Sequence, residues 1–486
     1  MRTRVFFRAD GNSIIGWGHV IRSLALADIL RNNFDCFFIT REIDQNLDRE
    51  INAVCKSLFI LPTNLSHINE AKYIRNNILT NKDICVLDGY LFDTSYQHEL
   101  KSEKNKLVCI DDIAKFHFIA DVIINQAGGV NSDKYSAEPY TRLALGPQYA
   151  LLRKPFREKI KQGKQINSLK NVFICFGAAD ENSIAQRMVT LCQTIERINE
   201  IHVVSSDKNI ETTRDNNKLY IHKNLSAEKM AGVMDKCHLA ICPASGIAYE
   251  VCSVGMGFIT GIHADNQKNI AEYLSSSEAA LNIGDFRSIN DFNLKKVIKN
   301  FEISMINKQI ENQKSILTSS ENLLRKIFEK LGLEFLINMR KANEKDAMIY
   351  FKWTNDPEVR QNSVNTSNIT VEEHIKWFYD KLNSSTSIFY IFEMEKTPIG
   401  QVRLDNKDGQ YTINYSIDSN YRGKGLSDVL VKMAIEGLCI ENKGELKFYA
   451  IVKEGNKASS KAFQNNSFKY KGLKQIDNTS YEVYQK

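Results

Sequence analysis

The sequence predicts an α/β fold of two Rossmann-like parallel-sheet domains in series, followed by a smaller α+β domain. Three observations predict it. Short apolar runs alternate with amphipathic segments through residues 1–155, the alternation restarts in residues 168–300, and after residue 336 helical segments precede antiparallel-looking strands. Such alternation is typical of a parallel sheet covered on both faces. We expect domains at 1–160, 161–305 and 336–486, with a helical linker at 306–335.

The composition is that of a globular protein with about three domains, because 486 residues exceed the roughly 150 of one domain. The formal charge of +6 is small for this length, which argues against a nucleic-acid partner but suits a small anionic substrate. No apolar run approaches the roughly 20 residues of a membrane helix, and the opening lacks the apolar core of a secretory signal. The ten cysteines have no zinc-ligand spacing, so we expect no metal site and reduced thiols, as in a protein with a cytoplasmic location. The missing membrane helix leads us to expect no membrane partner.

The first strand–loop–helix element reads RVFFRADGNSIIGWGHVIRSLALADIL. Residues 5–7 predict a buried strand, Gly11, Gly16 and Gly18 interrupt it, and a helical apolar pattern begins at His19. Such an element aims backbone N–H groups and a positive helix end at a ligand above the sheet. The loop lacks the third glycine of the dinucleotide fingerprint. On this stretch alone, a packed or capping His19 is as well supported as a His19 in a binding site.

Two further strands of this region end in acidic residues, Asp88 in VLDGY and the pair Asp111–Asp112 in CIDD. Ligands of open parallel sheets bind at the carboxyl ends of the strands, which makes these acids site candidates. The alternative is a helix cap. For Asp88 the helix cap and the ligand site are equally supported, and for the pair Asp111–Asp112 the helix cap is favoured.

The second alternating region repeats the strand-to-glycine pattern in FGAAD and in PASGIAYEVCSVG. The latter places Ser245 and Gly246 where a loop enters a helix, with Glu250 one turn further on. An acid in the first turn is stabilised by the helix dipole, which is the simpler interpretation of Glu250. The alternative is a hydrogen bond from a nucleotide ribose to Glu250, with loop amides binding the phosphates. Two such sheets in series imply a cleft between them.

A second glycine loop, RGKGLS, stands directly before a helix in the C-terminal region, after the strand pair GQVRLD and YTINYSID. Its glycines let successive N–H groups approach a pyrophosphate at the helix end. With the following YAIVKEGNKASSKAF, this region resembles the GNAT family of acetyl-CoA-dependent N-acetyltransferases over roughly 336–486. The resemblance implies acetyl-CoA as co-substrate. The implied contact residues are Ile417, Arg422, Gly423, Lys424, Gly425, Leu426, Ser427, Asn456 and Ser459.

The resemblance leaves the acid of this reaction unassigned. Many members of the family place a tyrosine, as acid for the leaving thiolate, at the position that is Phe463 here, and Tyr470 is a distant substitute. Glu372, Glu373 and His374 are further substrate-side candidates. For these three, a solvated helix face is the favoured interpretation.

The opening stretch RADGNSIIGWGHVIR also resembles the start of the UDP-sugar hydrolase of pseudaminic acid biosynthesis, whose pattern is RAD followed by G-x-GH-x-x-R. The resemblance continues through VLDGY, IDD, ADVIINQ, LGPQYALLRKPF, FGAAD, SGIAYE and ADNQ, which covers about residues 1–300. FGAAD departs from the family, which has a second glycine there. The implied fold is that of two-domain, GT-B-like nucleotide-sugar enzymes.

In that family the histidine of this motif is proposed to activate water, which implies that His19 is the base that directs water onto the anomeric carbon. Ser245, Gly246, Glu250, Asn266 and Gln267 would then hold uridine and diphosphate, and Asp10, Asp88, Tyr90 and Arg153 would face the sugar. The full expected substrate-binding set is Arg8, Asp10, Gly16, Gly18, Arg22, Asp88, Tyr90, Arg153, Ser245, Gly246, Ile247, Glu250, Asn266 and Gln267.

Both resemblances together imply a bifunctional enzyme of pseudaminic acid biosynthesis. It would acetylate the 4-amino group of UDP-4-amino-4,6-dideoxy-β-L-AltNAc and then hydrolyse the diacetamido product to free sugar and UDP. One alternative is a GT-B glycosyltransferase fused to an unrelated acetyltransferase. The other is a non-catalytic sugar-nucleotide-binding regulator.

Overall fold

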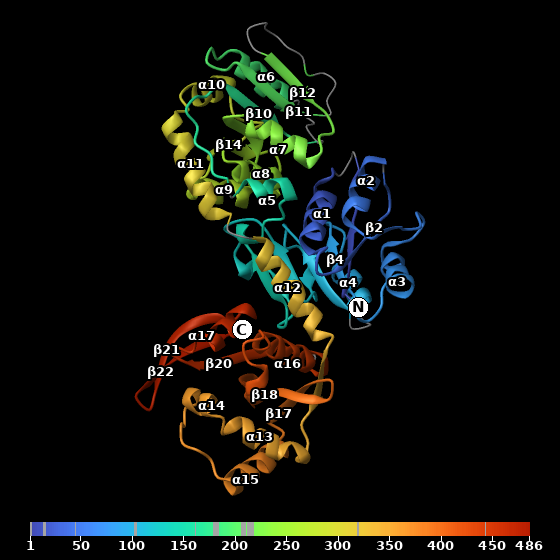
Figure 1. The fold of residues 1–486 in the computed structure, drawn as a ribbon, viewed down its shortest axis with the longest axis vertical. Coiled ribbons are helices and arrows are strands. Elements are labelled where there is room, and N and C mark those ends of the chain that lie inside the picture. The colour runs from blue at the N-terminus through green and yellow to red at the C-terminus, as the bar shows by residue number, and fades with distance from the viewer. Residues whose placement is uncertain are drawn as a thin grey trace. The chain divides into compact units, whose positions relative to one another are not determined.

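The structure is a computed structural model that describes residues 2–12, 16–43, 45–101, 105–160, 162–177, 184–205, 210, 218–317, 320–442 and 444–486. The chain forms two compact units (Figure 1). The first comprises Met1–Phe116, Ile123–Ser136 and Ala144–Arg325. The second comprises Lys326–Lys486 together with two earlier segments, His117–Val122 and Ala137–Leu143.

The first sheet has the strand order β3-β2-β1-β4-β5-β7-β9, and its four pairs from β3 to β5 are parallel. Its strands are β1 (Arg4–Ala9), β2 (Asp35–Thr40), β3 (Ser57–Ile60), β4 (Ile84–Asp88), β5 (Lys106–Ile110), β7 (Val122–Asn125) and β9 (Arg142–Leu145). The associated helices are α1 (Gly18–Leu30), α2 (Gln45–Val54), α3 (His67–Asn77) and α4 (Thr94–Lys101). The loop after β1 and the end of β4 meet at the carboxyl edge of this sheet.

The second sheet has the order β12-β11-β10-β13-β14-β15, which is the doubly wound Rossmann order counted from its own first strand. Its strands are β10 (Asn171–Cys175), β11 (Glu200–Val204), β12 (Lys218–His222), β13 (Leu239–Pro243), β14 (Gly257–Ile262) and β15 (Leu281–Asp285), all paired in parallel. Helices α5 (Lys154–Lys159), α6 (Ile184–Gln193), α7 (Ala227–Asp235), α8 (Gly246–Val254), α9 (Lys268–Ser276), α10 (Asp291–Lys299) and α11 (Ile303–Ile316) accompany it.

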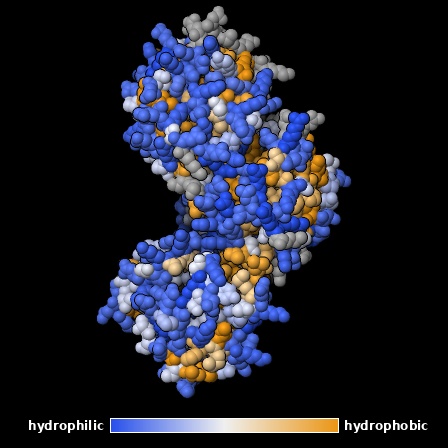
Figure 2. All heavy atoms as spheres, viewed as in Figure 1, coloured by the Kyte–Doolittle hydropathy of each residue, from blue (hydrophilic) through white to orange (hydrophobic). Residues whose placement is uncertain are grey.

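Alternate residues of the second sheet enter two separate cores. Phe173, Ala240 and Phe258 pack in one core, whereas Ile174 and Ile241 pack in the other. A strand buried on both faces needs apolar residues at consecutive positions, which explains the unbroken apolar runs in the sequence. All ten cysteines are free thiols and nine of them are buried. The visible face in Figure 2 is mainly hydrophilic, in keeping with cores that lie inside the sheets and helices.

The second unit is built on a mixed sheet of order β16-β17-β18-β19-β20-β22-β21. Its strands are β16 (Ile337–Lys341), β17 (Ser387–Met394), β18 (Thr397–Lys407), β19 (Gln410–Ile417), β20 (Lys447–Lys453), β21 (Lys469–Ile476) and β22 (Thr479–Gln485). The helices are α12 (Ser320–Glu334), α13 (Ala347–Thr354), α14 (Pro357–Asn362), α15 (Val371–Leu382), α16 (Ser427–Glu441) and α17 (Lys457–Asn465). A short pair, β6 (His117–Phe118) and β8 (Ser136–Ala137), comes from earlier in the chain.

Strands β19 and β20 are the parallel neighbours in this mixed sheet, and they separate. Their register runs only from Gln410 opposite Lys447 to Thr412 opposite Tyr449, although β19 continues to Ile417 and β20 to Lys453. The segment 413–417 is therefore a strand edge that faces the opening between β19 and β20. The predicted fold class is confirmed: two Rossmann-like parallel sheets precede an α+β domain with the GNAT arrangement.

Candidate active sites

The end of β4 and the start of α1 bring Asp88 against His19. Asp88 is the last residue of β4 and its side chain is fully buried, whereas the His19 side chain is 11% exposed. The His19 Nδ1 lies 2.7 Å from Asp88 Oδ1. A carboxylate that accepts the Nδ1–H bond fixes the orientation of an imidazole and leaves Nε2 with the free lone pair. This geometry prepares His19 to accept a proton at Nε2.

Asp88 is held in its ionised form by three side chains of α1. Arg22 donates from Nε to Oδ2 at 2.8 Å and from Nη2 to Oδ1 at 2.6 Å, and the Ser23 hydroxyl donates to Oδ2 at 3.1 Å. Burial alone would raise the pKa of Asp88, but Arg22 and the hydrogen bond from His19 outweigh burial and hold that pKa below its ordinary value. Asp88 is therefore an anchor for His19 and not a helix cap.

Tyr90 and Asp112 adjoin this pair. The Tyr90 ring meets the His19 ring edge-on, with 4.7 Å between ring centroids. Its hydroxyl donates to Asp112 Oδ2 at 3.3 Å and accepts from Asn266 Nδ2 at 3.1 Å. Burial, followed by the charge of Asp112, raises the pKa of Tyr90 to about 12, so the phenol stays neutral. Tyr90 thus joins the expected sugar side to Asn266, which was expected on the nucleotide side.

The two acids of CIDD have different surroundings. Asp111 Oδ2 accepts the backbone N–H groups of Ile113 and Ala114 at 3.1 and 2.8 Å. These bonds close a turn, and no helix begins in the described residues between β5 and β6, so the helix-cap interpretation is wrong for Asp111. Asp112 instead pairs with Arg22 at 3.2 Å. Its Oδ1 is buried without a hydrogen-bond partner among the described residues.

Arg8 and Asp10 form a supporting layer beneath the loop. Arg8 is 1% exposed and pairs with both Asp10 and buried Glu70, at 2.6 and 2.8 Å. Asp10 also accepts from the backbone N–H of Arg41 at 2.9 Å and keeps a 27% exposed side chain. Arg8 was expected to bind substrate. The structure places it below the surface, where it holds Asp10.

The glycine loop leads into an uncapped helix. Gly16 has φ = +79°, a left-handed value that favours glycine, and its N–H donates to the Asn12 carbonyl at 2.9 Å. The first N–H groups of a helix have no intrahelical acceptor. Trp17 is the N-cap of α1, and its side chain makes no capping hydrogen bond to them. A Cβ on Gly18 would meet nothing within 4 Å, so the helix start borders open space. Ser13, Ile14 and Ile15 of this loop lie outside the described residues.

The carboxyl edge of the second sheet carries the expected nucleotide residues. Ser245 is the N-cap of α8 and makes no side-chain cap bond, and a Cβ on Gly246 would meet only Gln126 Nε2 at 4.0 Å. Ile247 packs against the core beneath, and Gln267 accepts from the His263 N–H at 2.9 Å. The edge therefore presents an uncapped helix start. Ala178, Ala179 and Asp180 of FGAAD lie outside the described residues.

Arg153 and Glu250, which were expected on opposite parts of the substrate, bind each other. Arg153 donates from Nε and Nη2 to the two carboxylate oxygens at 2.7 and 2.9 Å. A bidentate pair of this kind fixes both side chains. Glu250 is consequently a salt-bridged carboxylate near the start of α8 in this structure, and Arg153 is its partner.

The second glycine loop precedes α16. Gly423 and Gly425 have φ of +75° and +70°, and a Cβ on either would meet nothing within 4 Å. Leu426 is the N-cap without a side-chain cap, and Ser427 begins the helix. The Lys424 ammonium lies 4.7 Å from the centroid of the Tyr421 ring. This open loop with an uncapped helix start fits a pyrophosphate.

Arg422 is held by protein groups. Its Nε donates to the Ile417 carbonyl at 3.1 Å, and its guanidinium pairs with Asp356 at 2.7 Å and Glu358 at 2.9 Å. These bonds tie the loop to the end of β19 and to α14. Arg422 was expected to bind the cofactor together with its loop. In the structure its side chain binds protein groups and holds the loop in position.

Ser459 and Phe463 of α17 contact Tyr415, which stands on the part of β19 that β20 leaves uncovered. Asn456 is the N-cap of α17 and accepts the Ser459 N–H at 3.1 Å, and the Ser459 hydroxyl lies 2.8 Å from Tyr415 Oη. Phe463 is 2% exposed and its ring meets that of Tyr415 with centroids 5.9 Å apart. Tyr415 was not singled out in the sequence, since a tyrosine in a strand usually only packs.

The expectation of a solvated helix face is wrong for His374. This residue is 1% exposed, and its Nε2 donates to the Ala347 carbonyl at 3.0 Å. Burial lowers its pKa, so the ring stays neutral. Glu373 forms a capping box with Thr370 at the start of α15. These residues build α15 and its contact with α13.

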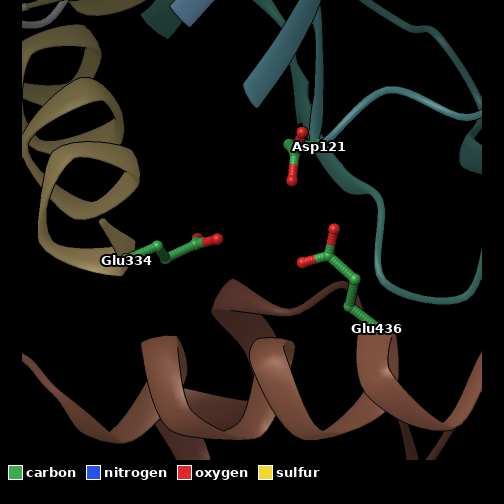
Figure 3. A group of neighbouring side chains, drawn as sticks. All are labelled: Asp121, Glu334 and Glu436. Carbon is green, nitrogen blue, oxygen red and sulfur yellow. The ribbon is translucent and has the colours of Figure 1, made fainter. Parts of the chain in front are cut away.

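One group of three acids among the described residues is close enough to hold a metal ion: Asp121, Glu334 and Glu436 (Figure 3). All lie in the second unit. The Lys432 ammonium lies 2.7 Å from Asp121, 2.8 Å from Glu334 and 3.6 Å from Glu436. A cation is thus already supplied by the chain, and we interpret the group as a buried ion-pair cluster.

Sequence reasoning missed the groups that hold the site residues in place: Ser23, Arg41, Glu70 and Tyr96. Tyr96 donates to Glu70 at 2.7 Å, and Arg41 pairs with the other oxygen of Glu70. Ser23 directly follows Arg22 in the helix, and adjacent helix positions do not in general share a face. Nothing in the sequence therefore indicated that both side chains would bind Asp88. Glu70 and Tyr96 lie on different helices, so their pairing is a tertiary fact.

The family model for the acetyltransferase (GNAT) domain matches residues 337–469. An uncharacterized protein of Methanocaldococcus jannaschii is 23% identical over 506 positions, which cover 98% of each chain. The UDP-2,4-diacetamido-2,4,6-trideoxy-β-L-altropyranose hydrolase of Campylobacter jejuni is 25% identical over 282 residues, 56% of this chain and 96% of that protein. The acetyltransferase PseH of the same species is 29% identical over 137 residues, 27% of this chain and 83% of that protein.

In the part of the chain that the structure describes, no helix combines the length and apolarity needed to span a bilayer. The Methanocaldococcus jannaschii relative aligns along nearly its whole length with this chain. The chain therefore carries a GNAT acetyltransferase domain behind a region that is similar to a UDP-sugar hydrolase, and these similarities support enzyme activity of the hydrolase and N-acetyltransferase classes.

Proposed function

We propose that the chain catalyses two consecutive steps on one UDP-linked amino sugar. The GNAT domain transfers an acetyl group from acetyl-CoA to the 4-amino group of UDP-4-amino-4,6-dideoxy-β-L-AltNAc. The hydrolase-type region then splits the product, UDP-2,4-diacetamido-2,4,6-trideoxy-β-L-altropyranose, into free sugar and UDP. The observation that carries the proposal is that one chain is related to a hydrolase of this diacetamido sugar nucleotide and also to an acetyltransferase. The product of the first reaction is the substrate of the second.

In the hydrolytic step, His19 accepts a proton from water at Nε2 while the water oxygen attacks the anomeric carbon. The bond between that carbon and the diphosphate oxygen breaks, and its electron pair leaves with UDP. The Nδ1 contact of 2.7 Å to ionised Asp88 supports this role, because the carboxylate stabilises the imidazolium that forms. Attack from the face opposite UDP inverts the anomeric centre.

UDP needs little help from a protein acid, because diphosphate is a good leaving group when its charge is stabilised. The uncapped helix starts at Gly18 and at Ser245–Gly246 support binding of this charge by backbone N–H groups. Asn266 and Gln267 would contact the nucleotide beside them. Tyr90, Asp112 and Asp10 supply hydrogen-bonding groups for the sugar, and Arg153 with Glu250 forms the neighbouring salt bridge.

In the acetylation step, the neutral 4-amino group attacks the thioester carbonyl of acetyl-CoA. Gly423, Gly425 and the first turn of α16 would hold the pyrophosphate, since their open backbone fits it. The edge of β19 near Ile417 would pair with the amide-containing arm of acetyl-CoA, because β20 no longer covers it there. This binding places the thioester in the opening between β19 and β20.

Proton NMR of the purified full chain with the UDP-4-amino sugar tests both steps. With acetyl-CoA we expect an acetylated UDP-sugar to appear first and free sugar with UDP to follow. Without acetyl-CoA neither should form. His19→Asn should stop the sequence at the acetylated UDP-sugar and lower the hydrolytic rate by about 10²-fold or more, since it removes the base. His98→Asn, a matched change at an exposed histidine of α4, should leave both steps intact.

Other outcomes would identify the alternatives. Acetylation without UDP release in the absence of an added acceptor sugar would favour a glycosyltransferase. A protein that binds the UDP-sugar and turns over neither bond, with or without His19, would be a regulator. Hydrolysis of a pre-acetylated substrate without acetylation of the amine would leave the GNAT domain with a different acceptor.

A further inference from the structure

The hydroxyl of Tyr415 lies where the uncovered part of β19 meets the first turn of α17. Tyr415 belongs to the segment of β19 that has lost its pairing with β20. Its ring lies on the same face as Ile413 and Ile417, because alternate strand residues share a face. Tyr415 is partly exposed, and Ile417 follows two residues later at the end of the strand.

Two serines converge on this phenol from two helix starts. Ser459, in the first turn of α17, has its hydroxyl 2.8 Å from Tyr415 Oη. Ser427, the first residue of α16, is the second serine beside the phenol, and both serines act to lower the pKa of Tyr415. Burial has the larger effect and raises the pKa of Tyr415 above its ordinary value, so the proton is retained at neutral pH. Either hydroxyl of the Tyr415–Ser459 pair can donate in this bond, and the phenol is free to give its proton elsewhere when it accepts from Ser459.

Two other tyrosines of this unit, Tyr470 and Tyr484, are less suitable donors. Tyr470 is 53% exposed on β21, and its ring contacts Tyr484 instead of the opening. Tyr484 donates its hydroxyl to Glu482 at 2.7 Å. Phe463, the apolar residue beside Tyr415, has no proton to give. Serine hydroxyls are much weaker acids than a phenol, so Ser427 and Ser459 are better relays than donors.

We propose that Tyr415 donates the proton to the sulfur of the departing thiolate in acetyl transfer, with Ser459 and Ser427 orienting its hydroxyl. The inference rests on the proposed acetyltransferase function. The amine nitrogen forms the new bond to the acetyl carbon, the carbon–sulfur bond breaks, and its electron pair passes to sulfur. The Tyr415 Oη–H proton moves to that sulfur to give free CoA. The phenolate then recovers the proton lost by the amine, through the serine hydroxyls or solvent.

Tyr415→Phe in the full chain isolates the hydroxyl, because the ring and its packing against Phe463 remain. We expect the single-turnover rate and kcat for acetylation to fall about 10²-fold or more. The KM for acetyl-CoA and the dissociation constant of CoA should stay within about threefold. Ser459→Ala, which loosens the phenol without removing it, should cost only about fivefold in kcat. Tyr470→Phe is the matched control and should behave as wild type.

Two results would overturn the assignment. One is a Tyr415→Phe variant that keeps kcat, or loses only affinity for acetyl-CoA, which would make the hydroxyl a packing group. The other is loss of kcat in Tyr470→Phe. The thermal unfolding midpoint of each variant shows whether a loss of kcat comes from misfolding instead. Hydrolysis of the pre-acetylated UDP-sugar gives an independent check that the first unit is intact.

A second acceptor separates this inference from the proposed substrate. Hydroxylamine attacks the same thioester and needs no sugar pocket, and release of the CoA thiol reports the breaking of the carbon–sulfur bond. A wild-type protein that acetylates hydroxylamine but not the UDP-amino sugar would refute the proposed acceptor. Tyr415→Phe should slow thiol release with either acceptor. Equal rates in wild type and variant would refute the role of Tyr415.

Discussion

The first site depends on how single side chains constrain one another. His19 acquires a direction because its Nδ1 is bound by Asp88, and Asp88 acquires a charge because Arg22 and Ser23 bind it in turn. A histidine at a helix start has none of these properties by itself. The same logic applies to Asp10, which is held by buried Arg8 and by the backbone of Arg41.

Asp88→Asn should lower hydrolysis without affecting acetylation. The amide keeps the shape of the side chain but cannot stabilise an imidazolium or enforce the Nδ1–H tautomer of His19. We expect the hydrolytic kcat to fall by about 10²- to 10⁴-fold. Release of UDP from the diacetamido sugar nucleotide measures the effect. Acetyl transfer by the same sample is the internal control, and an unchanged rate of UDP release would contradict the role given to Asp88.

At the scale of elements, salt bridges fix the helices that surround the site. Glu70 of α3 is 1% exposed and binds Arg8 of β1, Arg41 beyond β2 and Tyr96 of α4, so one carboxylate joins four segments. Burial alone would raise the pKa of Glu70, but Arg8, Tyr96 and Arg41 outweigh it and lower that pKa. The ordinary value is 4.5. The lowered pKa makes the stability of this region depend on pH.

Glu70→Gln should weaken the protein at neutral pH and flatten its acid sensitivity. Because the folded pKa lies below the unfolded one, the ionised form stabilises the fold above about pH 4.5, and this contribution disappears as the pH falls through the folded pKa. The variant lacks that contribution at every pH. We expect a loss of about 3 kcal/mol at pH 7, shrinking below pH 4.

Urea unfolding followed by circular dichroism at pH 7, 5, 4 and 3 measures this difference. Glu272→Gln, an exposed change on α9, is the matched control and should follow wild type at each pH. A constant difference between wild type and Glu70→Gln from pH 7 to pH 3 would show that ionisation of Glu70 is not the cause.

At the scale of the whole molecule, the second unit is assembled from distant parts of the chain. Tyr140 packs in its core, and Arg142 pairs with Asp428 at 2.5 Å and donates to the Asn465 carbonyl at 2.6 Å. The ammonium of Lys432 joins Asp121 to Glu334 inside the same unit. The GNAT-type unit is therefore completed by residues 117–122 and 137–143, far outside the segment that the family model matches.

Lys432→Met should destabilise the second unit. Lys432, Asp121 and Glu334 are 3%, 0% and 5% exposed, so removing the ammonium takes one ion-pair partner from each of two buried carboxylates. Breaking a buried pair in this way costs about 3–5 kcal/mol. Differential scanning calorimetry should show a lower midpoint for the acetyltransferase unit, with Lys461→Met, a change at an exposed position of α17, as control. A wild-type midpoint would contradict the stabilising role given to the Lys432 ion pairs.

The sequence by itself determined the fold class and the two motif regions, because both depend on local patterns. Apolar runs alternating with helices predict parallel sheets, and the glycines at 16, 18, 423 and 425 mark loops that precede helices. Residues adjacent in such motifs stay adjacent in space. The position of His19 at the start of α1 follows from this.

Only the tertiary structure decided which side chains meet. Asp88 and His19 are 69 positions apart, Arg153 and Glu250 are 97 apart, and Tyr415 and Ser459 are 44 apart. Sequence spacing carries no information about such pairs, since strand order and helix packing set them. The burial of His374 and Arg8 is a tertiary result for the same reason, because a polar residue enters a core only where another element provides its partner.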